Sequence, residues 1–326
     1  MKGNKYLKKV IITGSQGQDG VLLRQLLESQ GIEVIGFSRP NTTPDNDVRN
    51  YSKEQGVQDF RVDFGNFEDC LTAVGLMKPD TIFHLAAEHA PGHIMKTANW
   101  GTKRALAYRT HVLITENFVK SILETSLECQ LIVAGSSRMY TAEGAPLCVN
   151  ERTATKPIDF YGTTKVAAWQ VLRDYREKYG LVLKMAILFN HESKLRKPGY
   201  LFNDLASQIR MYISGEQDFI VLRDPDFKGD WHAAKDTITG LQIMAGDPNV
   251  GDLVLASGIS MTVQELVESY FEKYTTKLMP RIIVTGNAAN SGNNHQLVGD
   301  PSLAESFGWV RTHTISDVLH ESISDV

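Results

Sequence analysis

The chain has 326 residues, 42% of them hydrophobic, and its 34 basic and 38 acidic side chains leave a formal charge of −4. This size predicts one globular unit with two lobes, or two modest domains, and the charge balance argues against a nucleic-acid-binding protein. The sequence has neither an apolar stretch of about 18 residues nor the apolar run of a signal peptide, so we expect no membrane span and a cytoplasmic location.

The first half of the chain alternates strand-like and helix-like segments. Short apolar runs predict strands, and longer amphipathic segments predict helices. We expect strands at 8–13, 33–37, 60–62, 81–86, 131–134 and 183–188, and helices at about 19–30, 104–127 and 161–179. This alternation predicts an α/β fold with a Rossmann-like, doubly wound parallel sheet that helices cover on both faces.

After residue 190 the composition changes. We expect loops at 191–199 and 221–231, helices at 202–214 and 236–245, a strand at 253–256, an amphipathic segment at 262–274 and the most flexible stretch at 287–294. We therefore predict a dinucleotide-binding domain of residues 1–190 plus about 236–257. A smaller, interleaved C-terminal substrate lobe would comprise about 191–235 and 258–326.

A glycine-rich segment directly follows the first predicted strand. Its first glycine would allow a tight turn, its second would let backbone approach a pyrophosphate, and its third would let the helix pack on the strand. The N-terminus of the following helix would then face the phosphates. We expect the cofactor to contact Gly14, Gln16, Gly17, Gln18, Asp19 and Gly20, together with Leu85 and Ala86 at the end of the strand 81–86.

Arg39 follows the second predicted strand, where the choice of cofactor is made. An acid there would bind the ribose 2′-hydroxyl, whereas a cation favours a 2′-phosphate. We therefore predict NADP rather than NAD, with a solvated surface position of Arg39 as the alternative. Asp63, after the third strand, is equally suited to contact the adenine edge or to cap the next helix.

Tyr161 and Lys165 stand four residues apart, so they share one face of the predicted helix. A nearby ammonium favours phenolate, and a lowered pKa would make Tyr161 a usable general base. Ser136 lies just past the strand 131–134 and can hydrogen-bond the same substrate oxygen. These residues behind a glycine-rich turn predict redox chemistry on an alcohol, with a nicotinamide that carries the hydride and contacts Tyr161 and Lys165.

The three cysteines, Cys70, Cys129 and Cys148, are scattered and lack metal-ligand spacing. We expect no metal site and a reducing compartment. Small buried side chains are a better interpretation than a nucleophile.

Five segments resemble the extended short-chain dehydrogenase/reductase superfamily and, within it, the GDP-mannose 4,6-dehydratase family. They are residues 13–20, 161–179, 187–193, 230–236 and 308–309, and the resemblance spans nearly the whole chain. It implies a nucleotide-diphosphate sugar as substrate, with Asn190 near the diphosphate. It also implies a homodimer built from the two long helices, or a homotetramer.

The chain departs from this family at Arg138. The resemblance places there the glutamate that removes the C5 proton before water leaves C6, and a guanidinium cannot act as that base. Candidate substitutes are Glu88, His89 and His93, in a loop at the carboxyl end of a strand, and His191. In 4-keto sugar reductases and epimerases of the superfamily, a histidine near the position of His191 can serve as an acid. The alternative for each histidine is an ordinary surface or hydrogen-bonded role.

The family's phosphate-binding arginines are also missing. Gly229 stands before the pair 230–231, and residues 293–295 contain no arginine. Lys194, Arg196, Arg223 or Lys228 can replace them. The expected substrate-binding residues are Glu88, Arg138, Asn190, Lys194, Arg196 and Lys228. Three functions stay open: a dehydratase, a 4-keto reductase or epimerase, and a non-catalytic cofactor-binding regulator.

Overall fold

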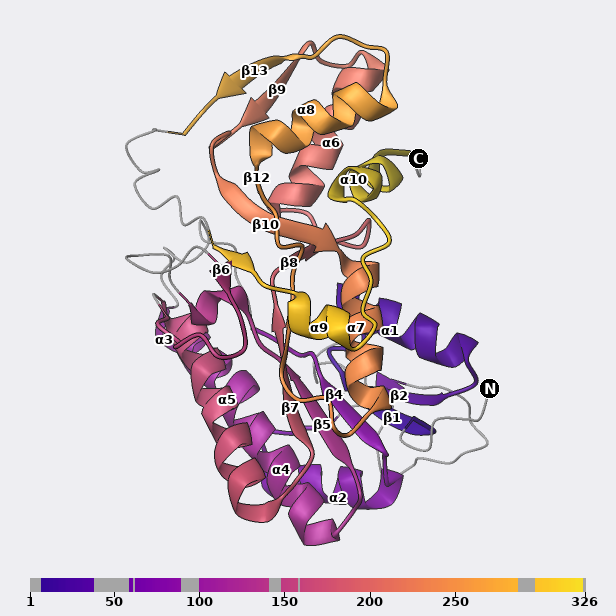
Figure 1. Ribbon diagram of the computed structural model, residues 1–326, viewed down its shortest axis with the longest axis vertical. Coiled ribbons are helices and arrows are strands. Elements are labelled where there is room, and N and C mark those ends of the chain that lie inside the picture. The colour runs from indigo at the N-terminus through magenta and orange to yellow at the C-terminus, as the bar shows by residue number, and fades with distance from the viewer. Residues whose placement is uncertain are drawn as a thin grey trace.

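A sheet of seven parallel strands forms the centre of the computed structural model, in the order β11-β7-β5-β4-β1-β2-β3 (Figure 1). The structure describes residues 7–37, 59–60, 62–88, 100–140, 148–157, 159–286 and 297–324. The strands are β1 (Lys9–Thr13), β2 (Glu33–Phe37), β3 (Asp59–Phe60), β4 (Thr81–His84), β5 (Gln130–Ala134), β7 (Leu183–Leu188) and β11 (Leu253–Leu255). The strand order reverses between β1 and β4, so the predicted doubly wound, Rossmann-like fold is confirmed.

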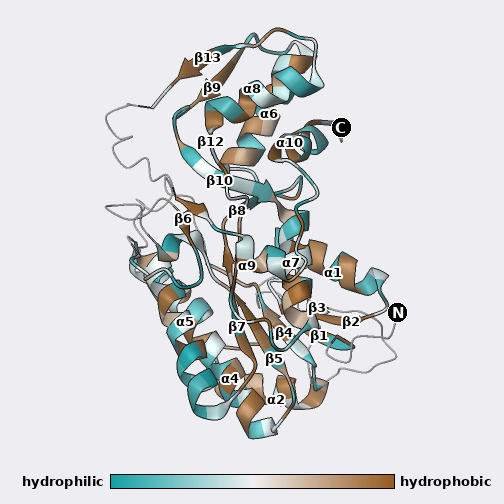
Figure 2. Cartoon of the chain, in the orientation of Figure 1, coloured by the Kyte–Doolittle hydropathy of each residue, from teal (hydrophilic) through white to brown (hydrophobic). Residues whose placement is uncertain are grey.

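Helices cover both faces of this sheet. One face carries α2 (Phe67–Met77), α4 (Ile114–Thr125) and α5 (Phe160–Tyr179), and the other carries α1 (Gln18–Ser29) and α7 (Ala234–Gly246) (Figure 1). Along β1, Val10 and Ile12 pack toward α1 and α7, whereas Ile11 packs toward α2 and α4. This alternation follows from the two-residue period of a strand. Figure 2 shows mostly apolar strands between helices that mix hydrophilic and apolar residues, and α5 is largely hydrophilic in this view.

The predicted helix at 104–127 contains a break in its regular geometry. It consists of α3 (Trp100–Tyr108), a π-helical turn η4 (Arg109–Leu113) and α4. A π turn inserts an extra residue and rotates the positions that follow it. It buries His111, whose exposed fraction is 1%.

The second group of elements lies beyond the carboxyl ends of the large sheet (Figure 1). It contains the strands β8 (Asn190–Glu192), β9 (Phe219–Leu222), β10 (Lys228–Ala233), β12 (Ser260–Thr262) and β13 (Arg281–Val284), and the helices α6 (Leu201–Ser214), α8 (Val263–Tyr274) and α10 (Ile315–Ser324). A separate hydrophobic core joins all of these elements except β8, which pairs with β10. Near the boundary, β6 (Cys148–Val149) pairs with β14 (Val298–Gly299), and α9 (Ser302–Ser306) follows. The exact division between the two lobes stays our proposal.

Several local predictions were wrong. The loop expected at 221–231 contains most of β10, and the loop expected at 191–199 begins inside β8. The strand β10, which contains charged residues and a glycine, is stabilised by pairing with β8 and β12. The buried carboxylate of Asp230 adds to this by accepting from Ser257, Gly258 and Gly299. We also missed α2, which Asn66 caps. Cys148 is exposed, whereas Cys70 and Cys129 are buried as expected.

Candidate active site

A glycine-rich turn connects the end of β1 to the start of α1. Gly14 has a φ of +73°, in the region that favours glycine, and its amide donates to Phe37 O over 3.0 Å. A Cβ on Gly14 would lie 2.9 Å from Ala86 N, so the turn packs directly on the segment after β4. A Cβ on Gly20 would overlap the carbonyl oxygen of Gly14. The close packing at both positions therefore requires glycine.

The N-terminus of α1 has no side-chain cap. Its N-cap residue, Gly17, has an extended backbone and makes no side-chain hydrogen bond to the first turn. Backbone N–H groups and the positive end of the helix dipole suit phosphate oxygens at such a terminus. The turn, with Gln16 within it and Leu85 and Ala86 beside it, thus fits the pyrophosphate of a dinucleotide. That these residues hold a cofactor remains our proposal.

Ser136 and Tyr161 come together at the carboxyl end of β5. Ser136 follows β5, and its hydroxyl is hydrogen-bonded to the side chain of Tyr161, in the first turn of α5. Lys165 is 2% exposed, and its Nζ donates to the carbonyl oxygen of Ala134 over 2.7 Å. The same Nζ lies 5.6 Å from the centroid of the Tyr161 ring. The structure therefore gathers Ser136, Tyr161 and Lys165 in one place.

The electrostatics of this trio differ from our expectation. Burial raises the pKa of Tyr161 to about 12, against the opposing influences of Arg138 and the Ser136 hydrogen bond. Burial also lowers the pKa of Lys165 to about 7. The prediction that the Lys165 ammonium lowers the tyrosine pKa is wrong for this arrangement, because the amine points to a backbone carbonyl and is itself desolvated.

Arg138 lies in a short 3-10 turn, η5 (Ser137–Met139), directly after Ser136. Its guanidinium forms an ion pair with Asp159, the N-cap of α5, whose other oxygen accepts from Gly162 N over 2.7 Å. Its backbone N donates to Ser136 Oγ over 3.2 Å. Burial lowers the pKa of Arg138, and the Tyr161 phenol opposes that effect. A fixed cation therefore occupies this position beside the tyrosine.

His191 joins β8 to the glycine-rich turn. Its Nε2 lies 3.0 Å from Asp19 Oδ2, and Gln18 donates to its carbonyl oxygen over 3.0 Å. Ser193 Oγ in turn donates to Gln18 over 2.8 Å. Burial lowers the pKa of His191, but Asp19 outweighs it and the net shift is upward. Burial raises the pKa of Asp19, yet His191 and Arg196 bring it down to about 2. His191 thus forms an ion pair between two predicted sites, and its role as an acid stays a prediction.

The remaining predicted residues are dispersed. Arg196 pairs with Glu192 over 2.6 Å and also donates to the carbonyl of His191. Asn190 and Lys194 are exposed. Hydrogen bonds from Thr262, and to a smaller extent the ammonium of Lys228, lower the pKa of Glu265 at the start of α8.

Asp63 accepts from Gly65 and pairs with Arg109, so Asn66 rather than Asp63 caps α2. Arg39, His89 and His93 lie outside the described residues. Within the part of the chain that the structure describes, no group of His, Cys, Asp and Glu could hold a metal ion, and no helix is long and apolar enough to cross a membrane.

His111 is a residue that our sequence analysis missed. Its ring meets the Tyr161 ring edge-on, with 5.2 Å between centroids. Its Nε2 accepts from the amide of Glu88 over 3.1 Å, which leaves Nδ1 to donate to Thr164 Oγ1 over 2.8 Å. Thr164 Oγ1 then donates to the carbonyl of Tyr161. The segment 104–127 looked like a regular helix, so only the π turn reveals this inward histidine.

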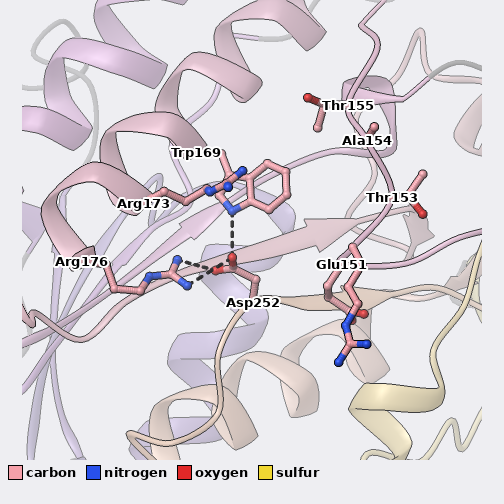
Figure 3. Close-up of a pocket in the computed structure, with 9 residues that line it drawn as sticks. Glu151, Thr153, Ala154, Thr155, Trp169, Arg173, Arg176 and Asp252 are labelled. Carbon is pink, nitrogen blue, oxygen red and sulfur yellow. Dashed lines mark hydrogen bonds and ion pairs between the residues drawn. The ribbon is translucent and has the colours of Figure 1, made fainter.

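A polar cavity of about 480 Å³ lies farther along α5, lined by residues 151–155, Trp169, Arg173, Arg176 and Asp252. Figure 3 shows the side chains that line it. Asp252 accepts from Trp169 Nε1 over 2.8 Å and from Arg176 Nη2 over 2.9 Å. It also accepts from Met185 N in β7 over 2.7 Å. This network fastens α5 to the sheet, and we do not place the active site there.

The chain is similar in sequence and fold to several known proteins. A family model described as GDP-mannose 4,6 dehydratase matches residues 11–322. A GDP-mannose 4,6-dehydratase of Sordaria araneosa is 25% identical over 98% of this chain, which spans 61% of that protein's length. Another, of Sinorhizobium fredii, is 28% identical over 82% of this chain and 76% of its own length. The UDP-glucose 4-epimerase of Thermus thermophilus, solved with NAD, has the same fold (TM-score 0.75, 19% identity, 98% and 100% of the two chains covered).

Proposed function

We propose, starting from the finding that this chain belongs to the GDP-mannose 4,6-dehydratase family, that it is an enzyme which transfers a hydride at C4 of a nucleotide-diphosphate sugar. The observation that carries this proposal is the meeting of Ser136, Tyr161 and Lys165 at the end of β5, near the turn that fits a dinucleotide pyrophosphate. A bound nicotinamide dinucleotide would accept or return the hydride.

The protein's own residues would move the proton. The Tyr161 phenolate would take the proton from the C4 hydroxyl as the hydride leaves C4; in the reverse direction the Tyr161 phenol would return a proton to the C4 carbonyl oxygen as the hydride arrives. Ser136 would hold the same oxygen by a hydrogen bond. Lys165, with its pKa lowered to about 7, can accept or release a proton near neutrality behind the tyrosine. This pairing of groups supports general acid–base chemistry on an alcohol.

The family name favours a GDP-mannose-type 4,6-dehydratase, but one observation favours a second candidate. Arg138 holds a fixed cation where the family resemblance places the proton-abstracting glutamate. A 4-keto reductase or an epimerase needs Ser136, Tyr161 and Lys165 but no carboxylate at that position. We therefore keep C4 hydride transfer as the proposal and place reductase or epimerase chemistry beside dehydration.

The finer features of the proposal follow from the sequence. Arg39 supports NADP rather than NAD. The exposed Asn190, at the start of β8, and Lys194, shortly after it, support diphosphate binding there. We propose a homodimer or homotetramer built on the two long helices; the exposed Leu106 and Tyr108 on α3 support such a contact. The unpaired cysteines support a cytoplasmic location.

One set of assays separates the candidates. Purified protein is incubated with GDP-mannose and a panel of other nucleotide sugars, with NADP⁺ or NADPH, and the products are weighed by mass spectrometry. Loss of water identifies a dehydratase, gain of two hydrogens with consumption of NADPH a reductase, and a new isomer of unchanged mass an epimerase. Tyr161→Phe serves as the matched blank. If the folded protein forms no product with any sugar of the panel, the proposed enzymatic function is overturned and the non-catalytic regulator remains.

A further inference from the structure

We propose that Arg138, whose backbone is packed against the turn that carries Tyr161, is the positioning residue that stabilises the ionised phenol of Tyr161, the task that sequence spacing alone gives to Lys165. The proposal rests on the proposed function in that Tyr161 is the group that exchanges the substrate proton. It adds to that function a specific source of positive charge.

Arg138 is held in a fixed position. Gly162 packs against the carbonyl oxygen of Arg138 so closely that a Cβ would overlap it. The backbone N of Arg138 donates to Ser136 Oγ over 3.2 Å, and its guanidinium pairs with Asp159 at the start of α5. Backbone and side chain are therefore both attached to the turn that carries Tyr161.

The side chain of Lys165 points to a backbone carbonyl. Its Nζ donates to the carbonyl of Ala134 over 2.7 Å and lies beneath the Tyr161 ring. Burial lowers the pKa of Lys165 to about 7, so near neutrality its amine is uncharged in a large share of the protein molecules. A guanidinium stays protonated throughout the working range. Arg138 is therefore the more constant cation.

The groups around the Tyr161 phenol differ in whether they favour its ionised form. Several polar and titratable side chains face the phenol from the elements packed against it. They are Ser136 before η5, Arg138 in η5, His111 in η4, Asp19 in α1, Tyr200 before α6, and Lys165 in α5 itself. Asp19 and Tyr200 disfavour phenolate. Arg138 is the largest influence in its favour, ahead of the Ser136 hydrogen bond.

The test measures the phenol directly, in the full-length protein without substrate. A fluorinated tyrosine, which ionises at lower pH than tyrosine, is incorporated at position 161, and its ionisation is followed by 19F NMR as the pH is raised. We expect Arg138→Met to raise the midpoint by about one pH unit or more, since an opposite charge at close range shifts a pKa by roughly that amount. Arg138→Lys should retain most of the native value.

Asp159→Asn is the matched control, because an asparagine keeps an oxygen acceptor for the amide of Gly162 but removes the anion beside Arg138. An electrostatic role for Arg138 predicts an unchanged or lower midpoint in this variant. A merely structural role predicts that breaking the ion pair from either side raises the midpoint. That result, or an unmoved midpoint in Arg138→Met, would overturn the proposal.

If Arg138→Met does not fold, as judged by circular dichroism, Arg138→Gln replaces it with the same expected rise. The titration needs no turnover, so it stands apart from the proposed function. If the protein is inactive but the Tyr161 midpoint rises in Arg138→Met, this inference is supported and the proposed enzymatic function is rejected. If the protein is active but the midpoint does not move, the proposed function is supported and this inference is rejected.

Discussion

His191 and Asp19 form an ion pair of 3.0 Å between β8 and the first turn of α1, so the glycine-rich turn is tied to the strand that begins the second lobe. The side chains are only 12% and 22% exposed. The pair therefore lies in a partly desolvated place, where a hydrogen-bonded ion pair contributes more than it does on the surface.

Asp19→Asn should lower the free energy of unfolding by about 2 kcal/mol. The pKa of Asp19 is lowered from 3.8 to about 2, so its contribution is present above about pH 4 and is lost as the pH falls toward 2. The pKa of His191 is raised above 6.5, so its contribution is present below that pH and is lost as the pH rises through the raised value. Urea unfolding should show the largest difference from the native protein between these limits.

His191→Asn and the double variant complete the cycle for this pair. We expect the double variant to be about as stable as either single variant, because the second change removes no further interaction. Strictly additive losses would show that the two residues do not interact.

Lys165→Met should abolish turnover and yet make the protein more stable near pH 7. Burial lowers the pKa of this lysine from 10.5 to about 7, so the unfolded chain binds a proton more readily than the folded one. The native protein therefore gains stability as the pH rises from 7 to 10.5, and its deficit relative to Lys165→Met should shrink over that range. Urea unfolding at several pH values measures this; a constant difference would contradict it.

Gly20→Ala should impair both folding and dinucleotide binding, because its Cβ would overlap the carbonyl of Gly14. We expect a loss of about 2 kcal/mol or more in the free energy of unfolding. The matched control is Gly251→Ala, whose Cβ would have no neighbour within 4 Å and which should change stability by less than about 0.5 kcal/mol. Equal effects of the two changes would argue against a tightly packed turn.

Tyr161→Phe should lower kcat by a factor of about 10²–10⁴, because general acid–base catalysis contributes rate accelerations of that size. Binding of the dinucleotide, measured by fluorescence quenching, should remain near the native value. A variant that keeps full turnover would remove Tyr161 from the mechanism.

Arg138→Glu should introduce dehydratase activity or increase it, because it places a carboxylate where the family resemblance requires one. Asp159 lies beside that position, and two carboxylates would disfavour each other's ionisation. The gain should therefore be larger in Arg138→Glu combined with Asp159→Asn. The measurement is water loss from GDP-mannose by mass spectrometry, with Arg138→Gln as the control. No gain in a folded double variant would count against our interpretation of position 138.

Much of the large sheet was predictable because its strands alternate with helices in sequence. The two-residue period of Val10, Ile11 and Ile12 and the four-residue spacing of Tyr161 and Lys165 are local properties. Other features depend on contacts between distant residues. The β10 strand forms although Gly229 and Asp230 are poor strand residues, because buried amides pair with that carboxylate.

The electrostatics of the site were less predictable for the same reason. Helical spacing places Lys165 beside Tyr161, but only the fold directs its Nζ to Ala134 and removes it from solvent. The π turn that brings His111 to the tyrosine ring leaves no clear trace in the hydrophobic pattern. Burial, rather than spacing, sets the direction of both pKa shifts.

The position of β11 constrains how the protein is made. Leu253 pairs with Ala186 at the outer margin of the seven-stranded sheet, yet more than 60 residues are synthesised between them, and most of these belong to the second lobe. A nascent chain that ends before residue 253 exposes the unpaired hydrogen-bonding groups of β7, a template for aggregation. The first segment of the second lobe must therefore be synthesised before the sheet of the first lobe is complete, and we expect truncation near residue 190 to yield insoluble material.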